Sequence, residues 1–153
     1  MKFTTFALCA ITAIGAGLMA TSALAGAGDD AVKGRQACMK SHGAGMGVFM
    51  PMMKGEKPFD KAAVAAVFAD WDKSCADWDK FWAPGAEKGE TLETWAKAEI
   101  WSDRKGFDAA GGVWYEGAEA VKASADEAAF KAAIPKMGDG CKGCHEKFRR
   151  PKN

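Results

Sequence analysis

Apolar residues recur along most of this chain at the three- and four-residue intervals of an amphipathic helix. The clearest stripe has this spacing throughout and consists of Ala63, Val64, Val67, Phe68, Trp71, Cys75 and Trp78. Asp60 precedes the stripe as a candidate N-cap, and Pro84 and Gly85 follow it as helix breakers. The pattern therefore predicts a helix from about residue 60 to residue 82.

The same reasoning predicts three more helices, over residues 29–53, from Thr91 or Thr94 to about 123, and 127–150. Ser124 or Asp126 is the expected N-cap of the last helix, and Pro135 inside it should kink or briefly interrupt it. Short connections between long helices are typical of an antiparallel up-down bundle. We therefore expect an all-α fold, an antiparallel up-down four-helix bundle.

Composition supports helices over strands, because Ala, Lys, Glu, Asp and Trp are prominent and β-branched residues are scarce. The 153 residues carry a net charge of +1 and contain no basic tract, so we expect no nucleic-acid partner. The glycine-rich run at 43–47 is the exception to the helical pattern. It either lets the first helix bend or approach a flat ring closely, or leaves a frayed segment.

The first 25 residues have the features of a secretory signal peptide. Lys2 is followed by an apolar run, Phe6 to Met19, and then by the cleavage pattern Ala23-Leu24-Ala25. The run is too short and too rich in glycine to favour a permanent membrane span. We expect cleavage after Ala25, a periplasmic product without a stable membrane span, and a single domain over residues 26–153.

Near the C-terminus, Cys141, Cys144 and His145 form a C-x-x-C-H sequence, the attachment signature of a c-type haem. Two thiols bond covalently to such a haem, and the adjacent imidazole becomes an axial ligand of the iron. The three side chains share one face of a helix. A thioredoxin-like redox pair would need a βαβ context, and a zinc site would need a second ligand pair. The sequence shows neither, so we expect one covalent haem c.

A haem motif in the last helix resembles the class II cytochromes c, which are cytochrome c′ and its low-spin relatives. Three further segments resemble this family in the same order, residues 31–36 (AVKGRQ), 54–60 (KGEKPFD) and 99–103 (EIWSD). The resemblance covers nearly the whole mature chain. It implies a four-helix bundle around one haem, His145 as the proximal ligand, and a protein that is not an enzyme. It also implies that a homodimer could form through the first two helices.

The resemblance extends to individual side chains around the haem. Arg35 resembles the family arginine that faces a haem propionate, although a solvated cation is the alternative. Gln36 and Glu99 match positions near the haem edge. Arg149 resembles the proximal-side arginine of cytochrome c′, and a cation at a helix C-terminus is also favourable in itself. Met39 falls at the position over the distal face of the iron.

Met39 separates two expected functions. If its thioether ligates the iron, the protein is a low-spin, one-electron carrier for redox partner proteins. If it only blocks the distal face, the iron is five-coordinate and binds NO or CO, as in cytochrome c′. Residues 39–43 and 54–60 resemble the low-spin members, which favours ligation. A third hypothesis, a thiol-disulfide oxidoreductase, would require free thiols at Cys141 and Cys144.

Two further features remain, and the second of them departs from the usual family pattern. His42 is the only other histidine, and it either lies on the face of Met39, where it could give a His/His iron site, or, as is commoner for histidine, lies on the surface. Cys38 and Cys75 lie at similar depths on either side of the first turn. They therefore form a disulfide or remain two buried thiols.

Overall fold

The computed structural model describes residues 22–151, with side chains from Gly28 onward. Residues 1–21 of the expected signal peptide lie outside the described residues. The helices of the described part are α1 (Ser22–Met53), α2 (Lys61–Ser74), α3 (Trp78–Phe81), α4 (Glu99–Ser102), α5 (Arg104–Lys122) and α6 (Glu127–Phe148). None of them is both long enough and apolar enough to cross a membrane.

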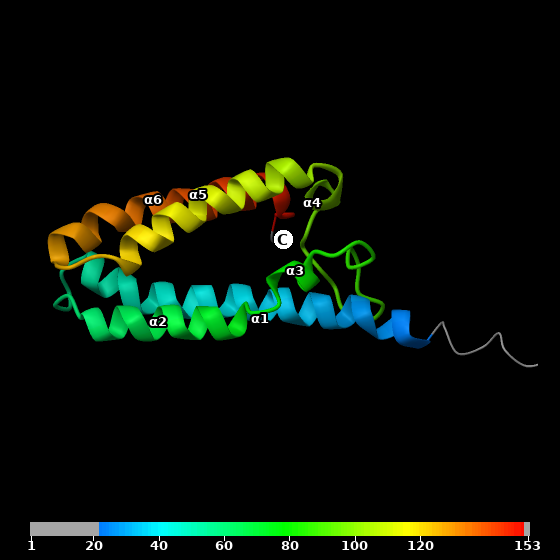
Figure 1. Cartoon of the computed structure of the whole chain (residues 1–153), viewed down its shortest axis with the longest axis horizontal. Helices are drawn as coiled ribbons and strands as arrows, with labels where there is room; N and C mark the ends of the chain where they lie inside the picture. The colour runs from blue at the N-terminus through cyan, green and yellow to red at the C-terminus, as the bar shows by residue number, and fades with distance from the viewer. Residues whose placement is uncertain (1–21, 152–153) are drawn as a thin grey trace, which may run out of the picture.

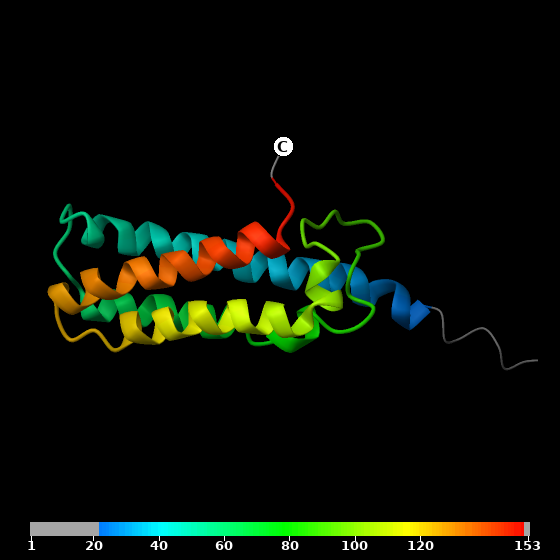
Figure 2. The same cartoon turned by 90° about the horizontal axis from the view of Figure 1, so that it is seen from above.

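The four long helices form two antiparallel pairs, α1 with α2 and α5 with α6 (Figure 1). Seen from above, α6 lies over α1 and α5 lies over α2 (Figure 2). Short turns join the members of each pair, whereas the longer segment from residue 82 to residue 98 joins one pair to the other. The predicted all-α, antiparallel four-helix bundle is confirmed.

Two of the predicted helix starts are confirmed by the cap geometry. The Asp60 carboxylate accepts hydrogen bonds from the backbone N–H groups of Ala62 and Ala63, at 2.9 and 3.1 Å. The Asp126 carboxylate accepts one from Ala129 N–H at 2.9 Å. Each bond satisfies a backbone donor that the first turn of a helix leaves without a partner.

The other predicted boundaries are wrong in three places. The stripe expected to form one helix to residue 82 is broken at residues 75–77, between α2 and α3. Neither Thr91 nor Thr94 starts a helix, because Asp103 caps α5 through Gly106 N–H at 3.0 Å. The first helix begins at Ser22 rather than Asp29. Of the two outcomes expected at Pro135, the brief interruption does not occur, because α6 continues through this residue.

Two separate hydrophobic clusters fill the bundle. The first lies toward the two short turns and consists of Phe49, Met52, Val64, Val67, Phe68, Trp71, Ala118, Val121, Phe130, Ile134 and Met137. The second lies toward the other end and consists of Cys38, Phe81, Trp82, Ile100, Phe107 and Phe148. Burial of these side chains is the main favourable contribution to folding.

Glycines allow close approach of helices at two places. A Cβ on Gly45 would lie 2.6 Å from the Trp71 ring, so part of the glycine-rich run does approach a flat ring, that of a tryptophan on α2. A Cβ on Gly117 of α5 would lie 2.5 Å from the backbone nitrogen of Met137 on α6. Because the atoms that a Cβ on Gly117 would meet belong to the backbone of α6, they cannot move to another rotamer as a side chain can.

Gly117→Ala is therefore expected to lower the free energy of unfolding by about 1–3 kcal/mol, the usual cost of overpacking. Gly112→Ala is the matched control on the same helix, because a Cβ there meets nothing within 4 Å. That change should instead stabilise the protein by about 0.5–1 kcal/mol through helix propensity. Urea denaturation of both variants measures the difference, and equal effects would contradict the close approach.

Candidate functional site

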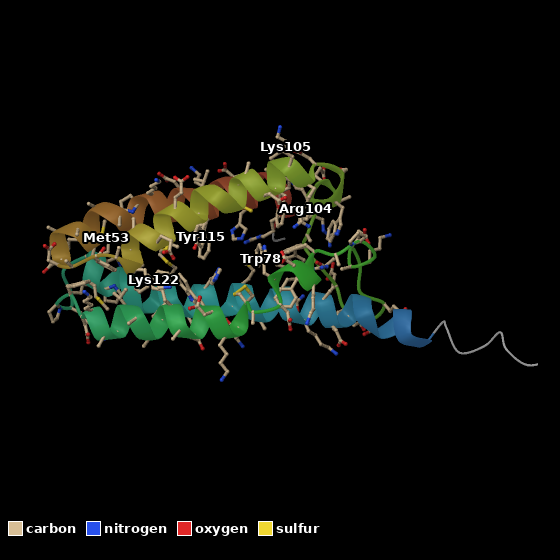
Figure 3. The ribbon with its side chains drawn as sticks, viewed as in Figure 1. Met53, Trp78, Arg104, Lys105, Tyr115 and Lys122 are labelled. Atoms are coloured by element: carbon tan, nitrogen blue, oxygen red, sulfur yellow. A yellow bond between two sulfur atoms is a disulfide. The ribbon has the colours of Figure 1, made fainter. Side chains whose placement is uncertain are left out.

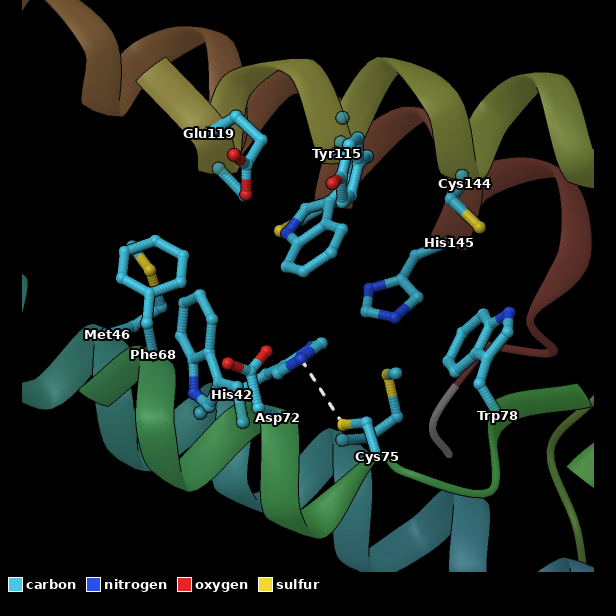
Figure 4. Close-up of a pocket in the computed structure, with 18 of the residues that line it drawn as sticks. His42, Met46, Phe68, Asp72, Cys75, Trp78, Tyr115, Glu119, Cys144 and His145 are labelled. Atoms are coloured by element: carbon cyan, nitrogen blue, oxygen red, sulfur yellow. Dashed lines mark hydrogen bonds between the residues drawn. The ribbon is translucent and has the colours of Figure 1, made fainter. Parts of the chain in front are cut away.

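A cavity of about 680 Å³ lies between the two helix pairs. Cys141, Cys144 and His145 border it from α6, and His42 borders it from α1. Figure 4 shows His42 on the opposite side of the cavity from Cys144 and His145. Figure 3 shows Trp78, Tyr115 and Lys122, which also border it. The volume is within the roughly 300–1,000 Å³ typical of cofactor and ligand pockets.

Burial shifts the pKa of all three motif side chains. Burial raises the pKa of both the Cys141 and the Cys144 side chain, which keeps them as thiols at neutral pH. Burial, and then the charge of Arg149, lower the pKa of His145. Its imidazole is therefore neutral at neutral pH, which is the form that binds a metal.

A second cavity of about 540 Å³ adjoins the first. Met39, on α1, and His145, on α6, border both cavities, as does Cys144. The predicted distal and proximal residues therefore come from facing helices and lie at the boundary of the same two spaces. The structure brings Met39 together with the haem motif, 102 residues later in the chain (141 − 39).

Arg35 is not a solvated cation, because it is buried and borders the smaller cavity. It is only 3% exposed, and burial lowers its pKa. Its guanidinium donates to the carbonyls of Phe81 at 3.1 Å and Ala86 at 2.6 Å, and to Thr94 Oγ1 at 2.9 Å. The remaining N–H groups bond to the Glu87 carbonyl, at 3.4 Å, and again to Thr94 Oγ1, at 3.2 Å. All five N–H groups thus have acceptors in the chain.

Of the other predicted cofactor-binding residues, Gln36 and Arg149 border a cavity and Glu99 does not. Gln36 is exposed, borders the smaller cavity and donates to the carbonyl of Glu93 at 2.9 Å. Arg149 also borders the smaller cavity, and its guanidinium lies 5.7 Å from the centroid of the Trp95 ring. Glu99 is exposed at the start of α4 and borders neither cavity. The structure therefore gives a haem-edge role no geometric support at Glu99.

His42 is inside the larger cavity rather than on the surface. Its ring stacks on Trp114, with centroids 4.9 Å apart, and meets Trp71 edge-on at 4.6 Å. Burial, followed by the nearby His145, lowers the pKa of His42 to about 4. Its Nε2 lies 3.6 Å from Sγ of Cys75. Of the two states considered for Cys38 and Cys75, the structure has the disulfide.

Sequence reasoning missed the contribution of α5 to the cavity. Phe107, Gly111, Trp114 and Ala118 all border the larger space, at intervals of four, three and four residues. That spacing places them on one helix face, and it is the signal that could have found them. The α5 face is thus the wall that completes the cavity opposite α1 and α2 (Figure 4).

The residues present fit a haem. Two thiols and a neutral imidazole from one face of α6 border a space of cofactor size whose other walls are largely aromatic and apolar. Apolar walls with few polar groups are typical of cofactor sites. The fold and the site together define a helical-bundle c-type cytochrome.

Comparison with known proteins agrees. The family model for cytochrome c′ matches residues 30–149. The chain is 34% identical to a cytochrome c′ of Cereibacter sphaeroides, over 84% of this chain and 88% of the relative. It is 32% identical to a cytochrome c-556 of Rhodopseudomonas palustris, over 86% of this chain and 91% of the relative. The chain therefore belongs to the cytochrome c′ family.

A solved structure agrees over the same length. It is a nitric oxide complex of a variant of the cytochrome c prime from Alcaligenes xylosoxidans. Its TM-score is 0.69 at 31% identity, over 80% of this chain and 96% of the solved chain. Membership of the family makes the protein an electron-transfer haem protein with one covalent haem c.

Proposed function

We propose that this cytochrome is a periplasmic one-electron carrier whose haem iron is ligated by His145 and Met39. The observation that carries the proposal is the placement of these two residues on facing helices, both bordering the same two cavities beside Cys144. The haem supplies an iron centre that alternates between Fe(III) and Fe(II). The expected signal peptide supports the periplasmic location, and the partners would be redox proteins.

The side chains around the cavities would set the properties of this centre. Cys141 and Cys144 would hold the cofactor covalently, and the His145 imidazole would bind on one side. The Met39 thioether, a soft ligand, would bind on the other side and raise the reduction potential. The surrounding aromatic rings, among them Trp71, Trp78 and Trp114, would give the haem an apolar surrounding.

The second candidate function is gas binding at a five-coordinate iron. The nitric oxide complex of the Alcaligenes xylosoxidans relative favours it. In this case Met39 would occupy space above the iron without bonding to it, and NO or CO would displace its side chain. The two candidates differ in one feature, which is the presence of a sixth ligand.

A visible absorption spectrum of the reduced, haem-loaded protein tests the proposal. Ligation by Met39 predicts the sharp α and β bands of low-spin iron and slow reaction with CO, because the sixth position is occupied. A broad high-spin spectrum with rapid CO binding would instead establish the second candidate. A mass equal to the bare polypeptide would exclude covalent haem and both candidates.

A further inference from the structure

Cys38, His42 and Cys75 each bring one ligand atom to within 4.8 Å of the other two. Cys38 and His42 are four residues apart on α1 and so share one face, and Cys75 is the C-cap residue that follows the last residue of α2. The sequence alone showed no second set of metal ligands, because 37 residues separate the two cysteines. The turn between α1 and α2 brings the two cysteines side by side in space, with their Cα atoms 4.9 Å apart.

The imidazole of His42 is held in one orientation toward this cluster. Trp114 stacks on one side of it and Trp71 contacts it edge-on. The indole N–H of Trp71 is itself fixed, because it donates to the Ser41 carbonyl at 3.0 Å. His42 Nε2 therefore remains directed at Sγ of Cys75, 3.6 Å away. Such support orients ligands before a metal arrives.

We propose that this cluster, once its disulfide is reduced, binds one thiophilic cation, Zn²⁺, through two thiolates and one imidazole. A dithiol reductant would give two electrons and two protons to the disulfide, becoming a disulfide itself and leaving thiols at Cys38 and Cys75. Zn²⁺ would then displace one proton from each thiol and accept the lone pair of His42 Nε2. None of the three residues attaches the haem or ligates its iron in the proposed function, so the inference goes beyond that function, although His42 and Cys75 border the same cavity as Met39 and His145.

The donor set and its spacing suit zinc. Two thiolates and one histidine leave the fourth tetrahedral position to water, a ligand set known in zinc enzymes. With Zn–S bonds of about 2.3 Å, tetrahedral geometry places the sulfurs about 3.8 Å apart. All three ligand atoms lie within 4.8 Å of one another while the two sulfurs are bonded in the disulfide, so the sulfurs would have to move apart on reduction.

Contacts other than the disulfide keep α1 and α2 together after reduction. The Ser41 and Ser74 hydroxyls are 2.6 Å apart, and they join the two helices directly beside the cluster. The Ser74 hydroxyl also lies 3.8 Å from Sγ of Cys75. Trp71 adds the bond to Ser41 described above. The thiols are therefore expected to stay close enough to share one ion.

The test uses the haem-loaded protein, because thioether bonds then remove Cys141 and Cys144 as competing ligands. A water-soluble phosphine reduces the disulfide, taking one oxygen atom from water to become the phosphine oxide while the protein gains two thiols. Thiol titration and the haem spectrum monitor this step. After addition of Zn²⁺ and gel filtration, we expect about one zinc per haem iron, because three ligands hold a single ion.

Three comparisons decide the outcome. His42→Phe keeps a ring between the tryptophans but removes one of the three zinc ligands. Loss of a residue that only supports a metal ligand typically lowers metal affinity by roughly 10–100-fold. Loss of the His42 ligand itself should lower the zinc affinity by more than that. Should that variant yield no haem-loaded protein, His42→Gln replaces it. The unreduced protein and the Cys38→Ser/Cys75→Ser variant should retain no zinc. Failure to release two thiols, no zinc in the reduced protein, or equal zinc in His42→Phe would each overturn the proposal.

Discussion

Arg35→Met is expected to lower the free energy of unfolding by about 3 kcal/mol or more. The methionine would fill most of the space of the arginine stem but would donate to none of its acceptors. The carbonyls of Phe81 and Ala86 would lose their buried donor, and each unpaired buried group costs about 1–3 kcal/mol. Urea denaturation of the haem-loaded protein measures the effect.

Two further variants show whether the planar shape and five N–H donors of the Arg35 guanidinium are responsible for the stability that Arg35→Met loses. Arg35→Lys keeps a charge but presents no planar fork, so it should recover only part of the lost stability. Lys33→Met changes an exposed cation on the same helix, whose ion pair with Asp30 is 3.9 Å long. It should be nearly neutral, as surface substitutions usually are. A similar effect of Lys33→Met and Arg35→Met would contradict the assigned role.

The same variant separates the observed role of Arg35 from the role that the family resemblance implied. An arginine that mainly faces a propionate would affect the reduction potential and its pH dependence, with little effect on folding. An arginine whose five N–H groups bind residues 81–94 should mainly affect folding. Measuring the potential and the stability of Arg35→Met together therefore identifies which contact dominates.

Helix boundaries that depend on neighbours in the sequence could be predicted, and those that depend on distant residues could not. Asp60 and Asp126 bond to backbone groups two or three residues away, so their caps follow from local chemistry. Thr91 and Thr94 looked like equally good starts. However, Asp29 accepts from Thr91 N–H and Oγ1, and Thr94 accepts from Arg35, contacts that span about sixty positions.

The same distinction applies to the site. The C-x-x-C-H motif is contiguous, so its chemistry can be read directly from the chain. His42 could not be placed from sequence, because its burial depends on Trp71 of α2 and Trp114 of α5. The intervals between Cys38, Cys75 and the first turn allowed a disulfide, but only the packing of α1 against α2 brings their Cα atoms to 4.9 Å.

Met39→Ala is expected to convert the low-spin spectrum of the reduced protein to a high-spin one. Alanine has no sulfur and is too short to reach the iron, so the sixth position becomes free for CO. The reduction potential should fall by on the order of 0.1 V, a part of the roughly 0.8 V range that axial ligands control. Visible spectroscopy, CO binding kinetics and a redox titration measure the three effects.

Met46→Ala is the matched control, because Met46 lies on the same helix and borders only the larger cavity. It removes a thioether of equal size from the same space, so it should leave the low-spin bands and the potential nearly unchanged. If Met39→Ala keeps the spectrum of the parent low-spin protein, Met39 is not the sixth ligand. If the parent is already high-spin, Met39→Ala should only accelerate CO binding, since the substitution then removes a steric block rather than a bond.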